Sequence, residues 1–247
     1  MLSTFFHAAF YNPIYNALVF LIDLIPGGDV GIAVVILTIL IRLILLPTSL
    51  SAARTQRSIK NLEPKLKEIK EKNKGKREQE ALETLALYRE AHVNPFASIL
   101  TVLIQIPILL ALFFVFRNEP FSVLDAAKLY FFTPIPDGVS LLFLGIVSVA
   151  GKSTILAAIA GITQYVQAHF AMKGTMKPSG TGMQADFQRI MGMQFRFVFP
   201  FLIAAIAYTT SGAVALYFIT TNLAGAVQEW WVKRQLDVSH PEHSATN

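Results

Sequence analysis

The chain of 247 residues contains no cysteine, which excludes disulfide frameworks, thiolate metal sites, iron–sulfur clusters and a cysteine nucleophile. Charged residues are also scarce, at 15% of the chain against about 25% in an ordinary soluble domain. The first basic residue is Arg42, so the N-terminal segment lacks the positive start of a signal peptide. Motifs of nucleotide-binding loops, nucleophile elbows and zinc proteases are missing, so we expect neither an enzyme nor a bound cofactor or metal.

Apolar residues are correspondingly abundant. Hydrophobic residues make up 53% of the chain, phenylalanine occurs 19 times, and the mean hydropathy is +0.50. A soluble chain of this size cannot hide that much apolar surface in one core. The composition therefore predicts an all-α membrane protein with several spans. It also argues against direct binding of nucleic acid, despite the net charge of +5.

Five stretches approach the length of about 20 apolar residues that crosses a bilayer. They are residues 30–51, 96–117, 153–172, 190–208 and 211–231. No internal repeat is visible, so an inverted-repeat transporter is not indicated.

Two apolar pieces do not fit a simple span. Residues 1–29 carry Pro13 early and Asp23 late around a short apolar run, which favours a helix lying on the outer membrane surface. Residues 118–152 are predicted to be an outer loop. Its apolar part, 139–150, is too short to cross alone and is expected to be a surface loop or a re-entrant piece.

Basic residues predict the orientation. They gather in residues 52–95, with 11 Lys or Arg beside 7 Glu, and recur in the loop 173–189 and in the tail 232–247. These segments share one side and hold 16 basic residues, whereas the other side has at most three. The positive-inside rule then places the N-terminus outside and the C-terminus in the cytoplasm, which five spans satisfy.

The charged segment 52–95 is predicted to be a cytoplasmic helical hairpin. Ile59, Leu62, Leu66 and Ile69 recur at the spacing of one helix face, and residues 73–76 carry a turn signal. Pro64 is expected to kink or restart the first arm. The residues leave two interpretations open: a solvated linker, or an element that contacts a partner or substrate.

Arg42 is the residue that points most directly to function. It lies twelve residues into the first predicted span, about 18 Å from its outer end. An arginine at that depth costs about 2.5–3.5 kcal/mol on insertion scales and is expected to face a bundle interior or a wet cavity. No acidic residue lies well inside the five spans, and Glu229 is at the end of the fifth, so no counter-ion for Arg42 is obvious. The alternative is that Arg42 extends to the cytoplasmic headgroups.

The other polar residues inside the predicted spans have two possible roles. Residues of this kind commonly form hydrogen bonds between helices, yet together they also suit a moderately polar cavity around Arg42. They include Gln105 in the second span, Gln164 and Gln167 in the third, and Thr220, Thr221, Asn222 and Gln228 in the fifth.

The order of motifs resembles the YidC/Oxa family of membrane-protein insertases. The chain reads YNPIYN, ILTILIRLILLP, LEP, VNPF, LIQIPI, FVFP, TSGAVALYF and NLAGAVQ, in that order, over residues 11–234. Each motif alone is weak. Their order and the one arginine deep within a predicted span, Arg42, make the resemblance specific.

The resemblance implies a fold and a mechanism. Five transmembrane helices would surround a hydrophilic groove that is open to the cytoplasm and to lipid, with a helical hairpin after the first helix. The groove arginine matches Arg42 and would attract acidic residues in the substrate's extracellular segment. The resemblance further implies groove or neighbouring positions at Thr38, Gln105, Gln164, Tyr217, Asn222 and Gln228.

The resemblance also implies partners and a location. The partners would be nascent membrane proteins with acidic extracellular segments and the lipid bilayer, with the Sec translocon and the ribosome as further candidates. The location would be the cytoplasmic membrane of a prokaryote. Rival hypotheses are a small-solute transporter or channel subunit, which would more typically carry acidic or paired charges near the midplane, and a structural subunit of a membrane complex.

Overall fold

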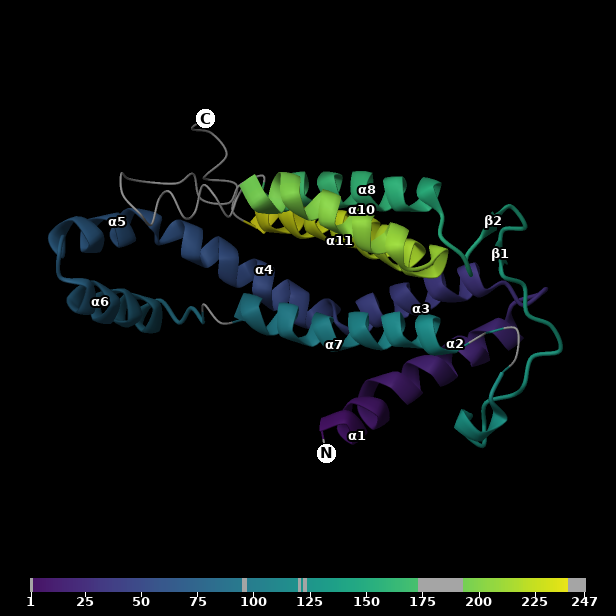
Figure 1. The fold of residues 1–247 in the computed structure, drawn as a ribbon. Coiled ribbons are helices and arrows are strands. Elements are labelled where there is room, and N and C mark those ends of the chain that lie inside the picture. The colour runs from purple at the N-terminus through teal and green to yellow at the C-terminus, as the bar shows by residue number, and fades with distance from the viewer. Residues whose placement is uncertain (1, 95–96, 120, 122–123, 173–192, 240–247) are drawn as a thin grey trace.

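The computed structural model describes residues 2–94, 97–119, 121, 124–172 and 193–239, and this part of the chain is almost wholly helical (Figure 1). The predicted all-α class is confirmed. The strands in the described part are two residues long, β1 (Leu142–Phe143) and β2 (Val147–Ser148). The helices are α1 (Leu2–Phe6), η1 (His7–Tyr11), α2 (Asn12–Leu24), α3 (Val30–Ile44), α4 (Leu46–Asn61), α5 (Glu63–Lys72), α6 (Arg77–Glu90), α7 (Ala97–Asn118), η2 (Ala126–Lys128), α8 (Thr154–Met172), η3 (Gln194–Val198), α10 (Phe199–Thr209) and α11 (Gly212–Ser239).

The longer helices form an elongated bundle of two layers (Figure 1). Helices α8, α10 and α11 pack on one another in one layer, and α3, α4 and α7 form the other. Helix α11 joins the layers because it contacts α3, α4 and α7 as well as α8. The α5–α6 pair extends past one end of the bundle, and β1–β2 lies at the opposite end.

The segment expected as the first span is bent. Helix α3 ends at Ile44, and α4 leaves it at an angle of 55°. Pro47 explains the break, because proline has no N–H to donate and its ring clashes with the preceding helical turn. Residues 30–51 are therefore two helices, and the second continues to Asn61, well into the segment expected as the hairpin.

Helices α5 and α6 form a charged hairpin. Helix α5 begins at Glu63 with Pro64 in its first turn, where proline is tolerated. The arms are joined by Glu83, whose carboxylate accepts hydrogen bonds from Lys72 Nζ at 3.1 Å and from Asn73 Nδ2 at 3.0 Å. These two donors lower the pKa of Glu83 below its ordinary value.

The bundle is apolar outside as well as inside. Buried side chains of α2, α3 and α11 form the centre of the core, among them Leu18, Val34 and Leu216. Large apolar side chains are also exposed along the outer faces of α7, α8 and α10. They include Leu103, Ile106, Leu110, Ile155, Ile159, Ile162, Phe201 and Leu202. An uncharged surface of this kind suits contact with lipid rather than water.

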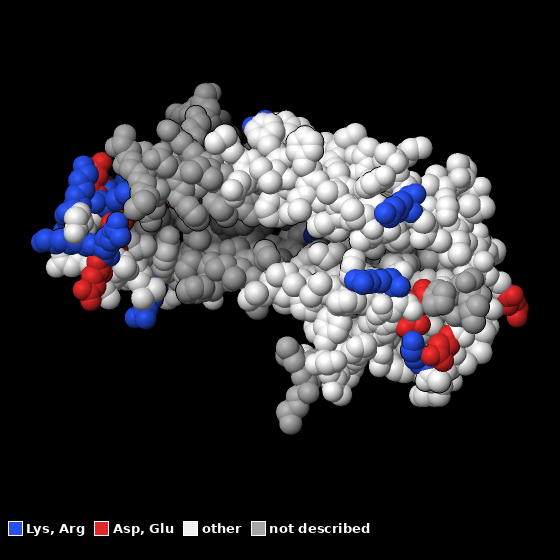
Figure 2. All heavy atoms as spheres, in the orientation of Figure 1, with Lys and Arg blue, Asp and Glu red and all other residues white. Residues whose placement is uncertain are grey.

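Charge is segregated along the bundle. On the face drawn in Figure 2, described acidic and basic side chains gather at the α5–α6 end and towards the opposite end. The helices between them present an almost uncharged band. This distribution agrees with a membrane protein, in which the band lies in lipid.

Length and hydropathy identify few individual spans in the described residues. One helical stretch, Ser3–Leu24, is long and apolar enough alone, and Val30–Ile44 with Leu46–Ala52 passes as a bent pair. Leu103–Asn118 and Arg196–Thr209 are apolar but shorter. Helices α8 and α11 contain glutamine and threonine, and α11 also contains asparagine; these residues lower the hydropathy of both helices. The count of five spans stays a prediction, and part of the stretch 190–208 lies outside the described residues.

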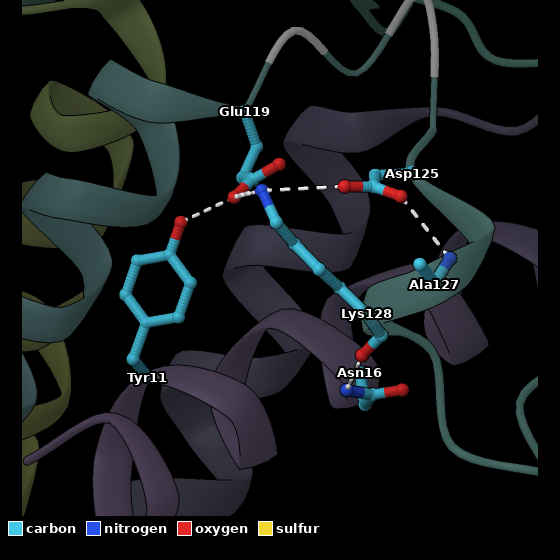
Figure 3. Close-up of polar contacts among 6 residues, drawn as sticks. All are labelled: Tyr11, Asn16, Glu119, Asp125, Ala127 and Lys128. Carbon is cyan, nitrogen blue, oxygen red and sulfur yellow. Dashed lines mark hydrogen bonds and ion pairs between the residues drawn. The ribbon is translucent and has the colours of Figure 1, made fainter. Parts of the chain in front are cut away.

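The N-terminal helix is tied to the end of α7 by a polar cluster (Figure 3). Glu119, whose side chain is 4% exposed, accepts hydrogen bonds from the Tyr11 hydroxyl and from Lys128 Nζ, the latter at 2.8 Å. Asn16 donates to the Lys128 carbonyl oxygen at 3.1 Å and accepts from Tyr130 N at 2.6 Å. The cluster thus fastens η1 and α2 to the loop that follows α7.

Two predicted segments are resolved further by the structure. Of the two alternatives for the apolar stretch 139–150, a surface loop or a re-entrant piece, its short β-hairpin is closer to the first. Helix α11 continues to Ser239, eight residues beyond the predicted end of the fifth span at residue 231.

Candidate functional site

Arg42 lies in the last turn of α3 and reaches across to α11. Its Nη2 donates a hydrogen bond to the backbone carbonyl oxygen of Thr221 at 2.9 Å. Its Nε is buried and has no hydrogen-bond partner within the described part of the chain. A buried guanidinium with an unused donor is able to bind a further acceptor, such as a carboxylate.

The surroundings of Arg42 come from α8 and α11. Gly225 leaves room for two side chains, because a Cβ built on it would lie 2.4 Å from Gln167 Nε2 and 3.4 Å from Arg42 Nη2. Glu229, one turn further along α11, interacts electrostatically with Arg42. The expectation that Arg42 lacks an acidic neighbour is therefore corrected: negative charge is near, at the end of the fifth predicted span.

Tyr217 joins this region to α7. Its hydroxyl accepts a hydrogen bond from Gln105 Nε2 at 3.2 Å, and it also interacts electrostatically with Arg42. Two of the residues singled out from the sequence, Gln105 and Tyr217, are therefore direct partners. Their hydrogen bond joins α7 to α11, and Arg42 on α3 lies beside Tyr217. The three helices therefore surround a common polar region.

Thr38 and Asn222 are buried, and their side chains donate hydrogen bonds inside the helix bundle. Thr38 is 2% exposed and its hydroxyl donates to the Val34 carbonyl oxygen at 2.7 Å, one turn back on α3. Asn222 is also 2% exposed and donates to α8, at the Ala160 carbonyl oxygen and at Thr163 Oγ1. The Thr38 bond stays within α3, whereas the Asn222 bonds are of the kind that polar residues make between membrane helices.

The remaining predicted positions flank the same region. Gln164 is half-buried on α8, three residues before Gln167, and Gln228 is half-buried on α11, three residues after Gly225. Residues three apart lie on one side of a helix. Sequence reasoning noted Gln167 but did not identify Gly225, since a lone glycine in a helix carries no signal until its neighbours are known.

A hollow runs between the two layers. Figure 2 shows it between the α8–α10–α11 side and the α3–α4–α7 side, with atoms of a basic side chain visible within it. The described residues around it are otherwise uncharged in this view. A single positive charge in such surroundings interacts with an anion more strongly than it would in water.

The sequence matches the model of a known protein family. The model of the 60Kd inner membrane protein family matches residues 21–239. The chain belongs to this family. The resemblance drawn from the order of motifs is thereby confirmed.

Individual relatives carry the name membrane protein insertase YidC. The protein of Fusobacterium nucleatum is 29% identical over 227 residues, which cover 91% of this chain and 97% of the relative. The protein of Clostridium tetani is 30% identical over 199 residues, 80% of this chain and 79% of the relative. That of Syntrophobacter fumaroxidans is 29% identical over 83% of this chain but only 34% of its own length. The family supports a membrane protein insertase over a transporter, channel or structural subunit.

Substitution of two glycines in the bundle is expected to change stability by different amounts. At Gly161 on α8 a Cβ would meet Ala204 Cβ at 3.0 Å and the Pro200 carbonyl oxygen at 3.2 Å. Gly161→Ala should therefore push α8 from α10 and cost about 1–3 kcal/mol, as overpacking does. At Gly225→Ala the close contact is with the flexible end of Gln167, and Arg42 Nη2 lies at van der Waals distance, so the substitution should leave the melting temperature nearly unchanged. Thermal unfolding of both variants in detergent checks this; equal losses would show that the end of Gln167 cannot move aside for a Cβ at residue 225.

Proposed function

We propose that this chain inserts transmembrane segments of nascent membrane proteins into the bilayer through a groove centred on Arg42. The observation that carries the proposal is the buried guanidinium itself, held by Thr221 on α11 with its Nε unused. An acidic residue in the extracellular segment of a client would pair with the guanidinium. The charge would thereby draw that segment partway across the membrane.

The polar region around Arg42 would shorten the path through hydrocarbon. Gln105, Tyr217, Gln164 and Gln228 are proposed to line the groove, since they come from three helices that surround Arg42. Asn222 is proposed to hold α11 against α8 in its wall, and Thr38 is proposed to be a neighbour of the groove on α3, with its hydroxyl bonded within that helix. Each polar group in the groove replaces part of the hydration that a crossing segment loses.

The final step needs no chemical energy source. An apolar client helix that leaves the groove enters lipid, and burial of its side chains is favourable by roughly 25 cal/mol per Å² of apolar area removed from water. The exposed apolar faces of α8 and α10 offer a surface along which such a helix would move. No bond is made or broken, which agrees with the expectation that the protein is not an enzyme.

The proposed topology has five spans, with the N-terminus outside and the C-terminus in the cytoplasm. It rests on the distribution of basic residues, which gather in segments 52–95, 173–189 and 232–247. In this orientation the α5–α6 hairpin is cytoplasmic, and the β1–β2 hairpin is on the outer side. The cytoplasmic hairpin is then available to meet clients, the ribosome or the Sec translocon.

Reconstitution of the purified chain alone into liposomes tests the function. A client with one span and a short acidic N-terminal tail is added, and protection of the tail from protease is measured. We expect protection well above that in empty liposomes, since neither a nucleotide nor a partner is required by the proposed mechanism. A chain that is folded, as shown by thermal unfolding, yet gives no protection would contradict autonomous insertion.

A further inference from the structure

The β1–β2 hairpin exposes an apolar surface that the proposed groove does not use. Leu142 is 46% exposed, Leu144 61% and Ile146 80%. Between residues 129 and 149 the sequence holds a single charged residue, Asp137. A hairpin tip surrounded by water normally carries polar residues, so these three side chains call for another environment.

The two faces of the hairpin differ. Successive side chains of a strand point to opposite sides, and Phe143 points to the bundle, where its ring lies 2.5 Å from the position of a Cβ on Gly31. Leu142, with its paired residue Ser148, is on the opposite face and is exposed. One face therefore packs on α3, and the other is exposed.

The turn at the tip is a second, independent sign. Leu144 and Gly145 both have positive φ, 53° and 72°, and Ile146 N donates to the Phe143 carbonyl oxygen at 3.0 Å. A two-residue turn of this kind favours Asn-Gly, because asparagine tolerates the left-handed conformation and leucine does not. A leucine kept there at a conformational cost is best explained by apolar surroundings.

Hydrogen bonds fix the hairpin beside the first turns of α3 and α11. Leu144 N donates to Asp29 Oδ2 at 2.7 Å, and Asp29 also caps the start of α3 by accepting from Ile32 N. At the base of the hairpin, Ala213 N in the first turn of α11 donates to the Val149 carbonyl oxygen at 3.0 Å. The tip therefore cannot lie far from the plane in which α3 and α11 begin.

The hairpin also adjoins a surface that suits lipid. In Figure 1 it lies beside the outer end of α8 and projects sideways, across the long axis of the bundle. The exposed apolar face of α8 begins in its first turn with Ile155 and continues through Ile159 and Ile162. Helix α3, with 15 residues, is about 22 Å long, shorter than the hydrocarbon core of about 30 Å.

We propose that the tip of the hairpin, Leu142–Ile146, is inserted among lipid acyl chains at the membrane face where α3 and α11 begin. The uncharged tip continues the lipid-facing surface of α8. Because the same hairpin is bonded to Asp29 and to the first turn of α11, it anchors both helices at a set depth. It thereby sets the depth of Arg42, which α3 carries.

The absence of cysteine makes the test direct, since single cysteines can be introduced without removing others. Leu144→Cys and Ile146→Cys are labelled with a nitroxide in phosphatidylcholine–phosphatidylglycerol liposomes, and collision with oxygen is compared with collision with a water-soluble nickel complex. Asp137→Cys serves as the aqueous control and Ile162→Cys as the lipid control. We expect the oxygen-to-nickel ratio at the tip to exceed that at Asp137 several-fold.

Two results would overturn the proposal. A ratio at the tip equal to that at Asp137 would place it in water. Low accessibility to both reagents would place it against protein, as in a contact with a second copy. Leu144→Asn gives an independent measurement, because asparagine tolerates the left-handed conformation of the turn. If the tip lies in water, this substitution should raise the melting temperature. If the tip lies in lipid, the polar side chain should lower it. A raised or unchanged melting temperature in liposomes would contradict insertion of the tip.

Discussion

Replacing Arg42 with alanine should reduce insertion of a client with an acidic tail by about tenfold, which corresponds to about 1.4 kcal/mol of lost interaction. Two unit charges 4 Å apart attract by about 4 kcal/mol at the effective dielectric constant of a partly buried site, and desolvation of both groups opposes part of this. A client in which each tail aspartate is replaced by asparagine should lose less than about twofold, because it has no charge to pair. Protease protection of the tail, measured with both clients, checks this difference.

The same substitution should not weaken the fold. A buried arginine in a membrane helix costs about 2.5–3.5 kcal/mol, and the hydrogen bond to Thr221 returns only part of it. Arg42→Ala should therefore melt at the same temperature as the wild-type protein or higher. Loss of insertion together with unchanged or increased stability separates a functional charge from a structural one. If both clients lose insertion equally, Arg42 holds α3 and α11 together and does not recognise the tail.

Arg42→Lys is the matched control for charge. Lysine keeps the positive charge but lacks the planar guanidinium that binds Thr221 and a carboxylate together. We expect insertion of the acidic client to lie between that of the wild-type protein and that of Arg42→Ala. An activity of Arg42→Lys no better than that of Arg42→Ala would show that geometry, rather than charge, is what the groove supplies.

The centre of the proposed site could be predicted from the sequence because a charge inside an apolar run is rare and expensive. Arg42 stands out for that reason, and the polar residues in three other apolar runs are candidates to surround it. The helical class follows from composition alone. Pro64 in the first turn of α5 is likewise a local effect of one residue.

What the sequence could not supply depends on contacts between distant segments. The bend between α3 and α4 has a local cause in Pro47, but its angle is set by packing of α4 on α7. The pairing of Gln105 with Tyr217 joins residues 112 apart. The space at Gly225 becomes meaningful only when Gln167 and Arg42 are placed beside it. The apolar run 139–150 has helical length but folds as a hairpin, because Leu144–Gly145 makes a tight turn and Asp29 binds its tip.

Removing the carboxylate of Glu119 should lower the stability of the protein by about 2 kcal/mol, because it leaves a buried Tyr11 hydroxyl without its acceptor. Lys128 also loses its ion-pair partner. Its side chain is 44% exposed and can be hydrated instead, so it contributes little to the loss of stability. Glu119→Ala is therefore expected to lower the melting temperature by several degrees. Thermal unfolding in detergent at neutral pH measures this.

Asp125→Asn is the control within the same cluster. Asp125 is 49% exposed and lies 3.6 Å from Lys128, so its loss should change the melting temperature very little. Equal effects of Glu119→Ala and Asp125→Asn would show that Lys128, and not the buried hydroxyl, determines the stability of the cluster. In a double-mutant cycle, Tyr11→Phe should remove most of the additional cost of Glu119→Ala.

The pH dependence of the cluster has a defined sign. The hydrogen bond and charge of Glu119 raise the pKa of Lys128 above its ordinary value of 10.5. A raised pKa in the folded state means that the stabilisation is fully present below the pKa of the unfolded chain and is lost as the pH rises through the folded value. The difference in melting temperature between the wild-type protein and Lys128→Met should therefore be constant around neutral pH and shrink in strongly alkaline solution. A difference that shrinks already between pH 7 and 9 would mean that Lys128 is not the group that titrates.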